Sequence, residues 1–146
     1  MPQISNFTEN KILDLLFRGQ AYTAPTVYVG LFTAAPSAAG GGTEVSGNAY
    51  ARVKTAASTS QGLGDWTATQ GGSSAASSGT SGNTTNVNAL NFPTPSASWG
   101  SVQWFGLFDS ASGGNLLWWG PLTIPKTINQ ADVVSFPAGS LSVTLS

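Results

Sequence analysis

The N-terminal part of the chain carries apolar side chains at a helical spacing that no later segment shows. Ile12, Leu15 and Leu16 fall at positions i, i+3 and i+4, and Leu13 and Phe17 widen this stripe. Residues at this spacing share one face, because an α-helix completes a turn about every 3.6 residues. The pattern therefore predicts one amphipathic helix near the start of the chain.

Residues that favour helix termini place this helix at residues 6–18. Asn6 is a suitable N-cap, and Glu9 three positions later completes a capping-box pattern. Arg18 suits the negative end of the helix dipole, and Gly19 suits the left-handed position after a helix. Two interpretations stay open: the helix packs on the core of its own domain, or it is an arm that docks on a neighbouring subunit.

After the helix, the pattern changes to the alternation and β-branched content of strands. Residues 26–32 place Val27, Val29 and Leu31 on one face. Residues 102–108 are apolar on both faces, which predicts a central strand that is buried on two sides. Shorter strands are predicted at 50–54, 89–92, 115–119, 133–136 and 141–145, and residues 102–119 form a hairpin around a Ser/Gly-rich turn.

Two stretches lack these patterns. Residues 34–47 contain Pro36 and a run of three glycines, which predicts a loop. Residues 56–88 consist almost entirely of Ser, Thr, Gly, Ala, Asn and Gln, with Leu63 and Trp66 as the large apolar anchors before Val87. Three interpretations of this long loop stay open: it carries functional contacts, it has no role, or it becomes ordered only against a partner.

Together these elements predict a mainly β protein. Residues 1–146 form a single antiparallel β-sandwich or jelly-roll-like domain with one N-terminal α-helix. The lack of further helical periodicity argues against a helix bundle or an alternating βαβ fold.

Composition excludes several classes of function. The charged fraction is 8% and the formal net charge is -1, with neither His nor Cys in the chain. This rules out zinc sites of the usual kind, disulfides, thiol catalysis and a Ser-His-Asp triad. Five scattered bases are too few for duplex nucleic acid. The chain shows no secretory signal and no membrane-spanning apolar stretch, so we expect no membrane partner. We also expect no cofactor.

Carboxylates offer one weak route to an enzyme. Asp65 beside Trp66 and Asp109 at a strand end are a conceivable pair for glycoside hydrolysis. The alternative is that each acidic residue caps a turn or a helix, as Asp commonly does. We expect no enzymatic activity.

Aromatic residues give the strongest functional lead. Trp118 and Trp119 are adjacent, so a strand directs them to opposite faces, and at a single-layer edge one is expected in the core and the other exposed. An exposed Trp suits an interface anchor or a sugar-stacking platform, whereas the alternative is that the domain covers both. The candidate interface residues are Ile12, Leu16, Phe17, Trp66, Trp104, Trp118 and Trp119.

A series of segments spread over the chain is familiar as a set. They are residues 9–17, 21–25, 27–36, 47–53, 92–93, 99–100, 105–109, 113–117 and 126–128. Together they resemble a family of small tailed-bacteriophage virion proteins that are often described as tail fibre proteins. In the Ser/Gly-rich middle this chain looks longer than the usual family pattern, and no role is carried over to residues 67–88.

The resemblance implies a structural protein of the virion that is assembled in the host bacterial cytoplasm and carries no catalytic residues. With 146 residues and no shaft of repeats, the favoured function is a capsid decoration (cement) protein, expected as a homotrimer that clamps the major capsid protein. The alternative is a tail fibre, collar or baseplate-associated protein that binds host-surface glycan. Expected partners are other copies of the chain, phage capsid or tail proteins and host glycan.

Overall fold

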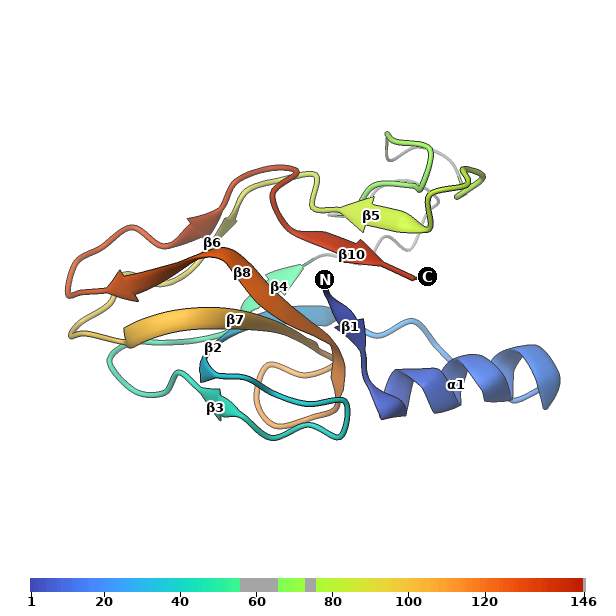
Figure 1. The fold of residues 1–146 in the computed structure, drawn as a ribbon, viewed down its shortest axis with the longest axis horizontal. Coiled ribbons are helices and arrows are strands. Elements are labelled where there is room, and N and C mark those ends of the chain that lie inside the picture. The colour runs from blue at the N-terminus through green and yellow to red at the C-terminus, as the bar shows by residue number, and fades with distance from the viewer. Residues whose placement is uncertain (56–65, 73–75, 146) are drawn as a thin grey trace.

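The main structural element is one antiparallel sheet. A computed structural model describes residues 1–55, 66–72 and 76–145 of the chain (Figure 1). The sheet has the strand order β1-β8-β7-β2-β3, and β4 also pairs with β2. Its strands are β1 (Gln3–Ile4), β2 (Val27–Ala34), β3 (Thr43–Glu44), β4 (Val53–Thr55), β7 (Gly100–Phe108) and β8 (Leu116–Ile128).

Two short ribbons cover one face of this sheet. The first pairs β5 (Asn83–Thr85) with β10 (Ser142–Thr144), and the second pairs β6 (Leu90–Asn91) with β9 (Ser135–Phe136). Their buried residues join those of the main sheet in one core. The predicted fold, a mainly β domain with antiparallel strands and one N-terminal helix, is confirmed, and its two layers are sandwich-like.

The two faces of the main sheet carry separate clusters of apolar side chains. Val29 and Leu31 of β2 are buried in the core beneath the ribbons, and Val27 packs against it, as predicted. On the opposite face Phe32, Phe108 and Leu116 form a second buried cluster. Strand β7 lies between β8 and β2 and contributes to both clusters, which confirms the prediction of a central strand buried on two sides.

The N-cap of the helix lies one residue earlier in the chain than predicted. Helix α1 spans Asn6–Phe17, and its N-cap is Ser5, whose hydroxyl oxygen accepts a hydrogen bond from the Thr8 backbone N–H at 3.2 Å. The predicted cap at Asn6 is wrong because long-range bonds fix this point of the chain. The Ser5 N–H donates to the Leu117 carbonyl at 3.0 Å, and the Asn6 N–H donates to the Ala38 carbonyl at 2.9 Å.

Several strand boundaries also differ from the prediction. Strand β3 lies inside the predicted loop 34–47, and β5 lies inside the predicted loop 56–88, of which residues 56–65 and 73–75 are outside the described part. The strand predicted at 50–54 begins only at Val53. Strand β8 continues to Ile128, whereas the prediction ended at 119. Beyond Trp119, β7 is the only partner of β8 among the described strands, and prolines are tolerated at such an edge.

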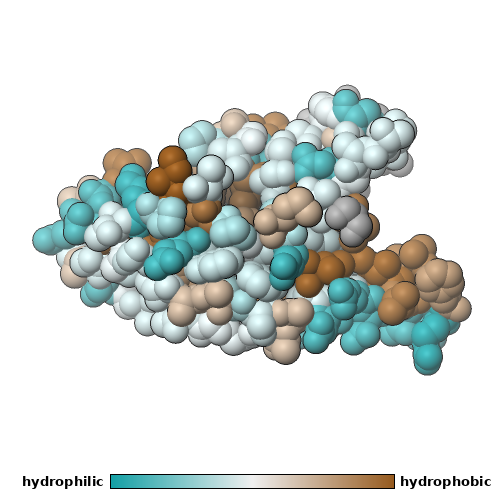
Figure 2. Space-filling view, viewed as in Figure 1, coloured by the Kyte–Doolittle hydropathy of each residue, from teal (hydrophilic) through white to brown (hydrophobic). Residues whose placement is uncertain are grey.

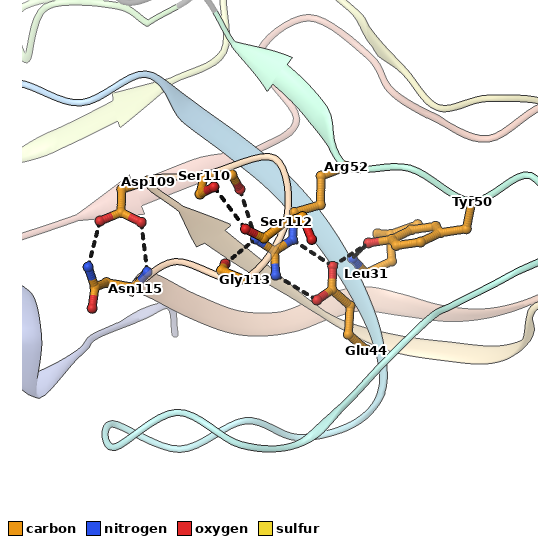
Figure 3. A network of polar contacts seen from close by, with 9 residues as sticks. All are labelled: Leu31, Glu44, Tyr50, Arg52, Asp109, Ser110, Ser112, Gly113 and Asn115. Atoms are coloured by element: carbon orange, nitrogen blue, oxygen red, sulfur yellow. Dashed lines mark hydrogen bonds and ion pairs between the residues drawn. The ribbon is translucent and has the colours of Figure 1, made fainter.

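A polar network holds β3 and β4 to the turn between β7 and β8 (Figure 3). The guanidinium of Arg52 donates to both carboxylate oxygens of Glu44, at 2.8 and 2.7 Å, and to the backbone carbonyls of Ser110 and Gly113, both at 2.8 Å. It also lies 3.4 Å from the centre of the Phe108 ring. One arginine therefore joins two segments that are distant in sequence, residues 44–52 and the turn at residues 110–113.

Tyr50 extends this network into the sheet. Its hydroxyl accepts a hydrogen bond from the Leu31 backbone N–H and donates to Glu44, both at 2.9 Å. Burial, reinforced by the Glu44 carboxylate, raises the pKa of Tyr50 above its ordinary value. The phenol therefore keeps the proton that it donates to Glu44.

Candidate interaction surfaces

Four of the carboxylates that the structure describes, those of Asp14, Glu44, Asp109 and Asp132, serve local structure. Asp109 accepts hydrogen bonds from the backbone and side-chain nitrogens of Asn115 across the β7–β8 turn, as in the turn-capping interpretation. Asp65, its conceivable catalytic partner, lies outside the described residues. Other local partners are Arg52 for Glu44, Arg18 for Asp14 and the Asn129 N–H for Asp132. Within the described ranges, no three His, Cys, Asp or Glu side chains are grouped to hold a metal ion.

The paired tryptophans of β8 lie on opposite faces of the sheet, as predicted. Trp118 packs against the core beneath the ribbons, and Trp119 packs against the second cluster, 5.9 Å from Trp104 between ring centres. Both are half-buried, and each indole Nε1 is buried without an acceptor among the described residues. The expectation of one core and one exposed Trp is not met, because Trp118 packs against the core and Trp119 packs against Trp104 and the second cluster.

Helix α1 carries the first uncovered apolar surface. We call it the helix surface and define it by residues that are 50–78% exposed: Leu13, Leu15, Leu16 and Phe17. At about 100° per residue these side chains spread over more than half of the helix circumference. Thr8 is the one buried residue of α1, and its hydroxyl donates to the Leu117 carbonyl at 3.1 Å. The helix is therefore fixed at its start and projects from the body at its end (Figure 1).

A hollow of about 290 Å³ lies beside the helix, between its first turn and the β5–β10 ribbon. We call it the groove. Figure 2 shows hydrophobic residues along the side of α1 that faces this ribbon and hydrophilic residues on its other side. Nearly all of the groove wall is apolar, and the residues that line it are Thr8, Tyr22, Pro25, Val27, Trp66, Gly82, Thr84, Leu107, Leu117, Trp118, Val143 and Leu145.

A second uncovered apolar surface, the far-end surface, lies where β8 ends and β9 begins. It is defined by Ile124 and Val133, which are 78% and 82% exposed. Both line a hollow of about 350 Å³, whose floor includes the half-buried core residues Val134 and Phe136. Figure 1 places this end of β8 opposite α1 along the long axis of the molecule.

The structure separates the predicted interface residues into three places. Leu16 and Phe17 belong to the helix surface, and Ile12, in the middle of the same helix, is half-buried. Trp66 and Trp118 line the groove next to the helix, with the Trp66 Nε1 donating to the Thr55 hydroxyl at 3.2 Å. The remaining two, Trp104 and Trp119, form a pair on the other face of the main sheet.

Sequence reasoning missed the far-end surface and the edge of the groove. Ile124 stands between Thr123 and Pro125, outside any apolar run, and Val133 belongs to the predicted strand 133–136, whose pattern does not show that its side chain is exposed. Leu145 ends the predicted strand 141–145, yet it is exposed and lines the groove. Leu13 lies outside the i, i+3, i+4 stripe, and its position in the sequence could have shown how wide the helix surface is.

Comparison with known proteins gives one family. A family model described as podophage GP4 fiber I protein gp80 matches residues 3–144, nearly the whole chain. None of the curated proteins matches the chain. In the part of the chain that the structure describes, no helix is long and apolar enough to span a membrane.

Proposed function

Because the chain belongs to the family of podophage GP4 fiber I protein gp80 and is a structural protein of the phage virion, we propose that it decorates the capsid. In this role a homotrimer sits on the outside of the shell as a clamp. Each copy contacts the major capsid protein and its own neighbours. The summed contacts resist the outward pressure of the packaged DNA.

The observation that supports this proposal is the pair of uncovered apolar surfaces at opposite ends of the molecule. A clamp needs two separate contacts, and the free energy of the system falls when apolar surface on both is removed from water. With 8% charged residues and a net charge of -1, little repulsion opposes contact between copies. We assign the far-end surface to the shell, which leaves the helix surface for a neighbouring copy.

The experiment is sedimentation of purified protein with phage heads that lack it. We expect the protein to pellet with heads, and the double variant Ile124→Ser, Val133→Ser to lose at least about tenfold in affinity, because two exposed apolar side chains leave the contact. Both residues are exposed, so the variant should fold normally. The matched control is Lys54→Ser, an exposed residue on the edge strand β4.

If wild-type protein stays in the supernatant when the heads are pelleted, the decoration proposal is overturned. If the double variant pellets as well as wild-type protein, the far-end surface is not the contact with the shell.

The family description supports a second candidate, a subunit of a tail, collar or baseplate fibre that touches the host surface. The half-buried pair Trp104 and Trp119 offers aromatic faces suited to sugar rings. Sedimentation with isolated tails instead of heads favours this candidate. Binding to host glycans that is lost in the Trp104→Ala variant would support a receptor contact at this pair. The absence of binding to any host glycan would exclude that contact.

A further inference from the structure

The free half of α1 lacks the cover that an apolar helix normally has. A surface helix usually turns its apolar face to its own core, but Leu16 and Phe17 remain 66% and 78% exposed. Neither residue lines the groove of its own chain, which is reached only by Thr8 in the first turn of the helix. The chain therefore presents an apolar arm and an apolar groove side by side without joining them.

We propose that the end of α1 inserts into the groove of a second copy, so that each chain donates one arm and receives another. This inference rests on the proposed function, because it names the partner of the helix surface. Arm and groove belong to the same chain, so a ring of copies satisfies every arm and every groove at once. Neither surface is left exposed in the closed ring.

The dimensions of the two surfaces agree with this exchange. The groove holds about 290 Å³. An apolar cavity of roughly 150 Å³ accepts benzene, so the groove has room for the side chains of Leu16 and Phe17. The two surfaces are also of similar extent, because helix α1 has 12 residues and 12 residues line the groove.

The charges of the arm permit the same contact. Glu9 and Asp14 balance Lys11 and Arg18, so the helix with its C-cap has no net charge. Arg18 and Asp14 already pair with each other at 3.0 Å. The two charged side chains at the end of the arm, Asp14 and Arg18, are therefore already paired, and an unpaired charge buried in an apolar groove would be costly.

The fixed root of α1 makes the arm ready for binding. The Ser5 and Thr8 bonds to the Leu117 carbonyl set the direction in which the helix leaves the sheet. Little conformational freedom is therefore lost when a second copy receives the helix, which favours association.

The test is the oligomeric state in solution, measured by light scattering during gel filtration. Wild-type protein is expected as a closed oligomer. The arm variant Leu16→Ser, Phe17→Ser should dissociate on the order of a hundredfold more readily, because two large exposed side chains leave the contact. The groove variant Leu145→Arg should dissociate likewise, since Leu145 lines the groove and is 54% exposed. Circular dichroism checks that both variants are folded.

Mixing the two variants separates arm exchange from simple pairing of helices. The arm variant keeps an intact groove, and the groove variant keeps an intact arm, so the mixture should form heterodimers through one arm and one groove. Helix pairing predicts instead that the groove variant alone remains oligomeric. A further check uses Phe17→Cys mixed with Leu145→Cys, which should form an intermolecular disulfide in a chain that has no other cysteine.

The outcomes also distinguish this inference from the proposed function. A monomeric wild-type protein, or an oligomer that neither variant affects, overturns the arm exchange even if the protein still pellets with heads. An oligomer that both variants break, together with no pelleting, supports the arm exchange and overturns capsid decoration. The far-end variant Ile124→Ser, Val133→Ser is the control and should keep the wild-type oligomeric state.

Discussion

Replacing Arg52 with leucine should lower the free energy of unfolding by about 3–5 kcal/mol. The Arg52 side chain is only 7% exposed, and its guanidinium pairs with both oxygens of Glu44. The substitution leaves this carboxylate without its partner and two backbone carbonyls, those of Ser110 and Gly113, without their donor. Loss of buried hydrogen-bond partners costs more than the bonds themselves contribute. Chemical denaturation monitored by Trp fluorescence measures the change.

The matched control is Arg18→Leu. Arg18 pairs with Asp14 at 3.0 Å, but its side chain is 73% exposed, and surface ion pairs contribute little. We expect a change of about 0.5 kcal/mol or less. Equal effects of the two substitutions would mean that the Arg52 network does not hold the β7–β8 turn to the sheet edge.

Replacing Gly106 with valine should destabilise the protein by about 3 kcal/mol or more, because the site has no room for a side chain. Even a Cβ atom at Gly106 would lie 2.8 Å from the Phe32 ring and 3.0 Å from the Leu116 side chain. Gly106 pairs directly with Gly30 of β2, and beside this pair of glycines the rings of Phe32 and Phe108 stack at 6.0 Å. The two glycines thus leave space for the aromatic cluster of the second face.

Gln103→Val on the same strand is the control for this substitution. Gln103 is exposed, and valine favours strands, so we expect a change within about 0.5 kcal/mol in thermal or chemical denaturation. A Gly106→Val protein as stable as this control would show that the cluster can be repacked without loss.

Local patterns predicted the elements whose periodicity lies within a few residues. The spacing of Ile12, Leu15 and Leu16 predicted α1, and alternation around Val29 predicted β2 and its buried face. The hairpin of β7 and β8 also follows from two apolar runs around a Ser/Gly-rich turn. In each case the signal and the element occupy the same short segment.

Elements that depend on distant partners were not predictable in this way. Strand β5 is a run of Asn and Thr that becomes a strand by pairing with β10, as Thr85 opposite Ser142 shows. The continuation of β8 past Pro121 depends on its pairing with β7.

For the interaction surfaces, the sequence predicted the apolar residues of α1 but not the groove. Leu16 and Phe17 were marked by helical spacing. The groove is formed by residues such as Trp66, Leu117 and Val143, which only the tertiary fold brings together. The same holds for the exposure of Ile124 and Val133, because no local pattern shows which part of the fold covers a side chain.

The most direct measurement is a cryo-electron microscopy reconstruction of the virion at a resolution that places helices and strands. Capsid decoration by arm exchange predicts copies on the outer shell, with Ile124 and Val133 against the major capsid protein and each α1 in the groove of a neighbouring copy. Copies confined to the tail, or heads on which Ile124 and Val133 face solvent while α1 contacts the shell, would contradict it.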